Sequence, residues 1–85
     1  MKTQLTQRYE RKYFANGQLW VDIPYDSGLV HGVMIEYYDN GQLHNRIPFE
    51  GGRPHGVAEA FRSDGSLKYL IFWSSGKVRN VKRIS

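Results

Sequence analysis

The stretch YYDNGQL, residues 37–43, occurs in related form at two other places in this chain of 85 residues. YFANGQL stands at residues 13–19 and FRSDGSL at residues 61–67, so the spacing is 24 residues without an insertion. Residues 13–36 and 37–60 share 11 identities in 24 aligned positions. Repetition at a fixed period predicts stacked units that cannot bury their apolar surface alone. We expect one domain over residues 1–85, with repeats at about 13–36, 37–60 and 61–84 and with residues 9–12 beginning the first strand.

Each repeat is predicted to form a β-hairpin. The segment QLHNRIPFE, residues 42–50, alternates apolar and polar side chains, which is typical of a half-buried strand. Asn-Gly and Asp-Gly between such segments favour tight hairpin connections. No helical period of apolar residues is preserved between the glycines. Six glycines at equivalent places are expected to shape the turns: Gly17, Gly41 and Gly65 in the hairpin loops, and Gly28, Gly52 and Gly76 in the turns between strands.

Two hairpin registers compete. A two-residue turn at Asn40-Gly41 would pair Tyr38 with Leu43. A three-residue loop, residues 39–41, would form a type I turn closed by a left-handed glycine and would pair Tyr37 with Leu43 and Val33 with Ile47. Burial selects the second register, because a slip of one residue moves every side chain to the other face.

The chosen register predicts an all-β, single-layer antiparallel meander with one apolar face. Strands are expected near residues 9–14, 18–25, 33–38, 42–49, 57–62 and 66–73, with a short one at 78–83. The expected apolar face holds Tyr9, Tyr13, Leu19, Val21, Ile23, Tyr25, Val33, Ile35, Tyr37, Leu43, Ile47, Phe49, Val57, Phe61, Leu67, Tyr69, Ile71, Trp73 and Val81. Because a single layer leaves such a face wet, we expect the sheet either to curl on itself or to meet a partner, which includes a homodimer.

The repeated EYYDNGQL followed by Gly-x-x-x-Gly-Val resembles MORN repeats, and most closely a bacterial MORN-variant group. The resemblance covers about residues 9–81. It implies an elongated sheet of hairpins and a non-enzymatic protein-interaction module with an antitoxin-like or immunity-like role, whose partner would be a toxin, an effector or a host factor.

The net charge of +4 is unevenly distributed. Residues 1–12 carry +3, residues 77–83 carry +4, and residues 13–76 carry −3. This is not one basic stripe, so no nucleic-acid partner is expected. The basic ends, together with the resemblance, favour peripheral binding to anionic lipid as the alternative function. The start of the chain lacks the apolar stretch of a secretory signal, so a cytoplasmic location is expected.

Chemistry-bearing motifs are few. Cysteine is absent, and His31 and His55 repeat at 24 residues while Arg79 takes the third place. A transition-metal site needs three or four ligands, so we expect each imidazole either to support a turn through a hydrogen bond or to pack against an aromatic partner. We expect no catalytic, cofactor or metal site and no enzyme activity. The predicted partner-binding residues combine aromatic rings and cations on the face opposite the apolar one: Trp20, Tyr38, His44, Arg46, Lys68 and Phe72.

Overall fold

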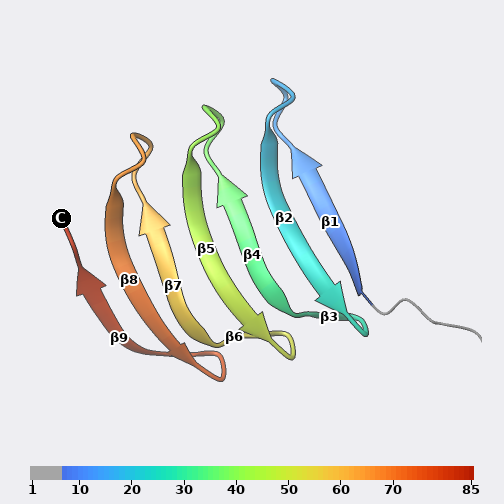
Figure 1. The fold of residues 1–85 in the computed structure, drawn as a ribbon, viewed down its shortest axis with the longest axis vertical. Coiled ribbons are helices and arrows are strands. Elements are labelled where there is room, and N and C mark those ends of the chain that lie inside the picture. The colour runs from blue at the N-terminus through green and yellow to red at the C-terminus, as the bar shows by residue number, and fades with distance from the viewer. Residues whose placement is uncertain (1–6) are drawn as a thin grey trace, which may run out of the picture.

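The computed structural model describes residues 7–85 as one antiparallel sheet, and this confirms the predicted single-layer meander. Figure 1 shows successive hairpins side by side, with bowed strands and no second layer. The shortest principal extent is 16 Å, as expected for one sheet with side chains on both faces. The neighbour order is β1-β2-β4-β5-β7-β8-β9. The strands are β1 (Gln7–Tyr13), β2 (Leu19–Asp26), β3 (Leu29–Val30), β4 (Gly32–Tyr37), β5 (Leu43–Glu50), β6 (Arg53–Pro54), β7 (Gly56–Phe61), β8 (Leu67–Ser74) and β9 (Lys77–Arg83).

The three hairpin loops have the predicted three-residue geometry. In the second repeat Tyr38 donates its N–H to the Gln42 carbonyl, and Gly41 donates to the Tyr38 carbonyl. The same pair of bonds closes the loops of the first and third repeats. Gly41 has φ +88°, a conformation that other residues adopt only with strain, so glycine is required there. The predicted pairing of Tyr37 with Leu43 is also confirmed.

Beyond the loop, the predicted register is wrong by one residue. Tyr37 pairs with Leu43, but Glu36 pairs with Asn45, so His44 is an extra residue that forms a β-bulge. Val33 therefore pairs with Pro48, not with Ile47. Equivalent bulges follow the first and third hairpin loops, where Trp20 and Lys68 are the extra residues.

The bulges divide the apolar residues between both faces of the sheet, so the expected single apolar face is wrong. Tyr9, Val33, Ile35 and Val57 lie on the side opposite to Val21, because their strand partners are Pro24, Pro48, Arg46 and Phe72. By strand alternation the pairs beside the hairpin loops lie on that side too: Tyr13–Leu19, Tyr37–Leu43 and Phe61–Leu67. One side, the Val21 face, carries Val21, Ile23, Met34, Ile47, Phe49, Ala58, Tyr69, Ile71 and Trp73. The other side, the Val33 face, carries Tyr9, Pro24, Val33, Ile35, Pro48, Val57, Leu70 and Phe72.

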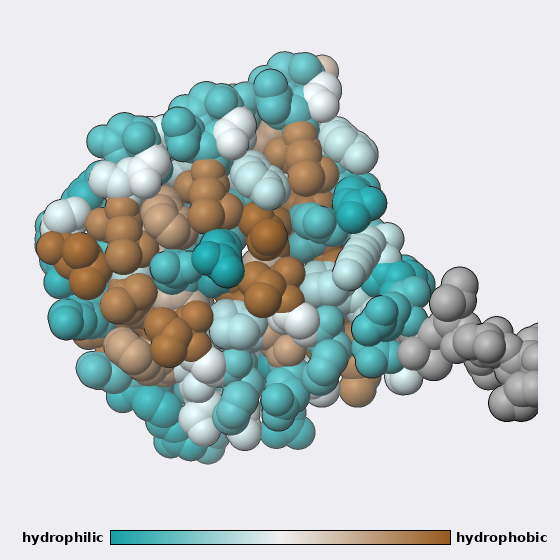
Figure 2. Space-filling model, viewed as in Figure 1, coloured by the Kyte–Doolittle hydropathy of each residue, from teal (hydrophilic) through white to brown (hydrophobic). Residues whose placement is uncertain are grey.

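The Val21 face is the better covered of the two. The two buried hydrophobic residues of the described chain, Val21 and Ala58, lie on it, whereas Val33 is 41% and Val57 48% exposed on the other side. In the view of Figure 2, apolar side chains gather over the middle of the strands and polar ones cover both strand ends. The core is therefore a thin central band, and substantial apolar surface stays in contact with solvent.

The turns between repeats contain structure that the sequence did not predict. The two-residue strands β3 and β6 pair with β2 and β5. After each of them the chain makes a sharp break at Gly32 or Gly56, with φ +114° and +116°. Each of these glycines packs closely against a proline ring. A Cβ added to Gly32 would lie 3.3 Å from Pro24 Cγ, and a Cβ added to Gly56 would lie 3.1 Å from Pro48 Cγ.

The third repeat departs from this pattern because Asn80 replaces the glycine. Asn80 is not among the residues with positive φ. Trp73 pairs with Val78 and its neighbour Phe72 pairs with Asn80, so Arg79 is one unpaired extra residue in β9. In the first repeat, the pairs Tyr25–Val30 and Asp22–Ile35 enclose two residues on β2 but four on the partner segment, which therefore has two extra residues. The difference of one residue turns Val81 to the Val21 face, opposite Ile71.

Candidate functional site

A row of aromatic and cationic side chains lies on the Val21 face beside the hairpin loops, and we call it the tip surface. It is built from the residue before each of the first two loops and from the bulge residue after each of the three loops, positions that recur every 24 residues. Phe14 contacts Trp20 with ring centroids 6.0 Å apart, and Tyr38 stacks on His44 at 4.0 Å and 23°. The tip surface consists of Phe14, Trp20, Tyr38, His44 and Lys68.

The middle of the tip surface is held by hydrogen bonds. The Tyr38 hydroxyl donates to the Phe61 carbonyl of the next repeat at 2.8 Å. Glu36 Oε1 accepts from Asn45 Nδ2 at 2.9 Å and lies 3.9 Å from His44 Nδ1. Tyr38 and His44 are half-buried. The stacked pair is therefore fixed before any partner arrives, which lowers the entropy cost of binding.

The ends of the tip surface are more open. Trp20 is 39% exposed, and Lys12 Nζ lies 6.0 Å from the centre of its ring. In the third repeat Lys68 Nζ lies 5.2 Å from the Tyr69 ring centre. The surface thus changes from aromatic in the first repeat to cationic in the third.

The structure brings together four of the six residues predicted to bind a partner and separates the other two. Trp20, Tyr38, His44 and Lys68 belong to the tip surface. Arg46 and Phe72 lie on the Val33 face, where Arg46 Nη1 bonds Glu59 Oε1 at 3.0 Å. The prediction that all six share one face is wrong, because the bulge residues turn toward the Val21 face.

Sequence reasoning missed Phe14 as a member of the surface. Its signal was the 24-residue equivalence of positions 14, 38 and 62.

Side chains near the loops also tie one repeat to the next. Asn16 Nδ2 donates to the Asp39 carbonyl and Asn40 Nδ2 donates to the Ser63 carbonyl, each 23 residues further along the chain. The Oδ1 atom of each asparagine accepts an N–H within its own loop. Asp64 occupies the third place; its carboxylate accepts from the Ser66 N–H and hydroxyl, and these bonds lower the pKa of the Asp64 carboxyl.

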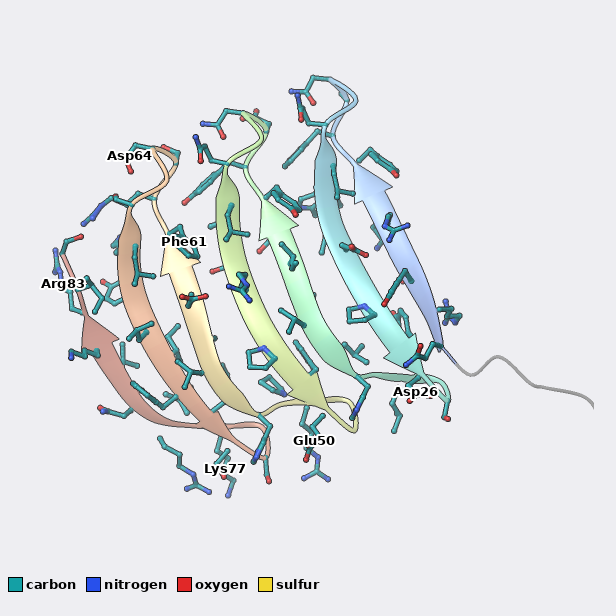
Figure 3. All side chains as sticks on the ribbon, viewed as in Figure 1. Asp26, Glu50, Phe61, Asp64, Lys77 and Arg83 are labelled. Atoms are coloured by element: carbon teal, nitrogen blue, oxygen red, sulfur yellow. The ribbon has the colours of Figure 1, made fainter. Side chains whose placement is uncertain are left out.

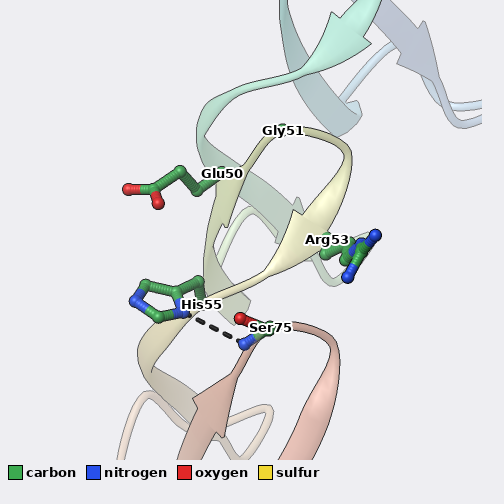
Figure 4. Close-up of a pocket in the computed structure, with 5 residues that line it drawn as sticks. All are labelled: Glu50, Gly51, Arg53, His55 and Ser75. Atoms are coloured by element: carbon green, nitrogen blue, oxygen red, sulfur yellow. Dashed lines mark hydrogen bonds between the residues drawn. The ribbon is translucent and has the colours of Figure 1, made fainter.

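At the opposite end of the sheet the histidines form hydrogen bonds to turns, which is the first of the two roles expected for them. Figure 3 places Asp64 near one end of the hairpins and Asp26, Glu50 and Lys77 near the other. There, His31 Nδ1 accepts the Gly51 N–H at 3.3 Å, and His55 Nδ1 accepts the Ser75 N–H at 3.0 Å. Figure 4 shows the second of these bonds, within a hollow of about 220 Å³ that Glu50 and Arg53 also line. Each imidazole thus supports the turn of the following repeat.

Along residues 7–85, no group of three or more His, Cys, Asp or Glu side chains is placed to hold a metal ion. The same residues contain no helix that is long and apolar enough to cross a membrane.

Comparison with known protein families finds a similarity in the first two hairpins. A family model described as the MORN repeat variant matches residues 9–27 and 30–50, which lie in the first two hairpins of the sheet. Neither the curated proteins nor the solved structures gave a significant match. These two segments are therefore similar to MORN repeats.

Proposed function

We propose that this chain is a protein-interaction module that binds its partner through the tip surface. The observation that carries the proposal is the rigid stack of Tyr38 on His44, with the exposed Trp20 ring one repeat away. Trp, Tyr and cationic side chains on a preorganised scaffold have the composition of interface hot spots. The tip surface also extends across three repeats of a single-layer sheet, a breadth that suits a protein surface better than a small molecule.

The partner is proposed to be a protein that the chain inhibits. The resemblance of the repeats to a bacterial MORN-variant group favours an antitoxin-like or immunity-like role in the cytoplasm. The partner would then be a toxin, an effector or a host factor that the sheet covers and blocks. Inhibition of that partner in vitro by the purified chain would support this role, whereas tight binding that leaves the partner active would exclude it.

The tip surface is tested with a partner recovered from the native host, purified, and titrated against variants. Trp20→Ala should weaken binding by about 2 kcal/mol, which is the cost of truncating an interface anchor. Phe72→Ala is the matched control, because it removes an aromatic ring of the same sheet from the Val33 face. Melting temperatures are measured in parallel. If Trp20→Ala lowers the melting temperature but leaves affinity per folded molecule unchanged, the tip surface is structural and the proposal fails.

Binding to an anionic membrane surface is the second candidate function. The observation that favours it is β9, which carries Lys77, Arg79, Lys82 and Arg83, no acidic residue, and no half-buried side chain. Each such cation near an anionic surface contributes about 1 kcal/mol. Liposome co-sedimentation at increasing salt tests membrane binding. Binding that is lost above physiological ionic strength would support this function, and the absence of binding at low salt would exclude it.

A further inference from the structure

β9 is an edge strand of the sheet formed by residues 7–85. We propose that β9 is a docking edge for an acidic, extended segment of a partner protein, which adds to the sheet as a further strand. This surface is separate from the tip surface, and it does not require that the tip surface bind anything.

The first observation is the direction of the backbone groups along β9. Ile84 donates its N–H to the Lys68 carbonyl of the hairpin that precedes it. Because neighbouring residues of a strand point their N–H and C=O groups to opposite sides, Val81 and Arg83 direct theirs to the open edge. The Val81 N–H is bonded to Asn80 Oδ1 at 2.9 Å. An amide side chain thus occupies the position that an incoming carbonyl would take.

The second observation is a reversal of hydrogen-bonding character at the end of the repeat series. In the first two repeats, His31 and His55 offer an acceptor to the turn that follows. The equivalent Arg79 carries only donors. The N–H groups of a further turn would face the Arg79 guanidinium, which cannot accept a hydrogen bond. A carboxylate at the same position would accept hydrogen bonds from the guanidinium.

The third observation is charge. β9 has four cations in seven residues, and its pattern of burial is exposed throughout. Along residues 7–85, no ion pair joins these cations to a carboxylate. A second copy of the chain is disfavoured as the occupant, because two β9 strands would place like charges side by side. The other edge, β1, carries Arg8, Arg11 and Lys12 against Glu10, so it would also repel β9.

These observations together select an acidic strand. Strand addition supplies affinity through main-chain hydrogen bonds, and alternate side chains supply selectivity. Lys82 lies opposite Leu70, toward the Val33 face, and Arg83 lies opposite Tyr69, toward the Val21 face. An incoming strand with carboxylates on both faces could therefore form an ion pair with Lys82 on one face and with Arg83 on the other.

The test uses the full chain and a fluorescein-labelled peptide of about eight residues in which glutamate alternates with threonine and valine, which favours an extended conformation. Fluorescence polarisation should show saturable binding that weakens as salt is raised from about 0.1 M to 0.5 M. Two matched peptides are the controls. One has lysine in place of each glutamate and should not bind. The other has methylated amides at alternate residues and should bind at least about tenfold more weakly, because it has lost its main-chain donors.

Protein variants locate the edge. Val81→Pro removes an outward N–H without touching the bonds to β8 and should weaken peptide binding about tenfold. The double variant Arg79→Glu, Lys82→Glu should do the same, while Lys12→Glu, on the far edge, should have little effect. Asn80→Ala frees the Val81 N–H and should strengthen binding. Circular dichroism confirms that each variant is folded.

Three results would overturn the proposal. The first is equal binding of the methylated and unmethylated peptides, which would mean a basic patch without strand addition. The second is peptide binding that survives Val81→Pro in a folded protein. The third is no peptide binding while vesicles containing phosphatidylserine bind and lose binding in the double variant, which would assign β9 to a membrane. Trp20→Ala should leave peptide binding unchanged, so failure at the tip surface and failure at β9 are distinguishable.

Discussion

The contact between Gly56 and Pro48 gives a sharp prediction about what holds neighbouring strands together. Gly56 has φ +116°, and a Cβ built on it would stand 3.1 Å from Pro48 Cγ and 3.6 Å from Pro48 Cβ. Gly56→Ala therefore imposes two costs. The backbone strain of an alanine at positive φ is about 1–2 kcal/mol. Crowding against a packed group costs typically about 1–3 kcal/mol, and a proline ring cannot rotate away as a flexible side chain would.

The expected loss is thus about 2–4 kcal/mol of the free energy of unfolding. A chain of this length has a total of roughly 4–13 kcal/mol, so the loss is a large share of it. Gly28→Ala is the matched control, because Gly28 also has positive φ, +84°, but nothing lies within 4 Å of its added Cβ. It should show the strain alone, about 1–2 kcal/mol.

Urea unfolding followed by tryptophan fluorescence is a suitable assay, because Trp73 is the strand partner of Gly56. Adding Pro48→Ala to Gly56→Ala should recover about 1 kcal/mol relative to the sum of the single changes, since contacting residues are not additive. Equal losses for Gly28→Ala and Gly56→Ala, with no coupling to Pro48, would refute the steric argument.

The remaining predictions address the loops, the links between repeats, and association. Gly41→Val and Gly65→Val should each lower the free energy of unfolding by more than about 1 kcal/mol, because a β-branched residue resists positive φ; an unchanged urea midpoint would contradict this. Asn40→Asp should cost about 1 kcal/mol by removing the donor to the Ser63 carbonyl. Asp64→Asn should cost less at neutral pH than Asn40→Asp, because the asparagine oxygen can still accept from Ser66 although the charge is lost. A larger loss for Asp64→Asn than for Asn40→Asp would contradict the proposed hydrogen-bonded link between repeats. The folded pKa of Asp64 is lowered from its ordinary 3.8, chiefly by the Ser66 hydroxyl, so its stabilisation is present above 3.8 and is lost as pH falls through the lower folded value. Asp64→Asn should accordingly flatten the acid side of the curve of melting temperature against pH, and an unaltered slope would exclude the contribution. Self-association through exposed apolar surface is expected in sedimentation velocity at micromolar concentration; a clean monomer near 9.9 kDa that binds no hydrophobic dye would rule it out.

The hairpin loops were predictable because their chemistry is local. Asn40 accepts the Gln42 N–H through its side chain, and Gly41 supplies the positive φ, so three adjacent residues specify the whole turn. The same pattern at residues 15–17 and 63–65 places the other two loops. Strand positions follow from these loops and from the alternation of residues 42–50, and the structure agrees with them closely.

The faces of the sheet were not predictable from alternation, because one bulge residue per hairpin reverses it. Nothing in the neighbourhood of His44 marks it as an extra residue, and its stack on Tyr38 forms only when the strands are paired. A pattern of period two assigns sides relative to an assumed register, so one undetected insertion moves every later residue. This is why Arg46 and Phe72 were grouped with the tip surface, although they lie on the Val33 face.

The departures of the third repeat from the first two share one physical consequence. Where Asn16 and Asn40 donate to the following loop, Asp64 has no donor to offer when it is ionised. Where His31 and His55 accept from the following turn, Arg79 has no acceptor. Each change removes a contact that a further repeat of the same kind would need. A strand that pairs with β9 would therefore meet different charge and different hydrogen-bonding groups from those that the first two repeats offer their neighbours.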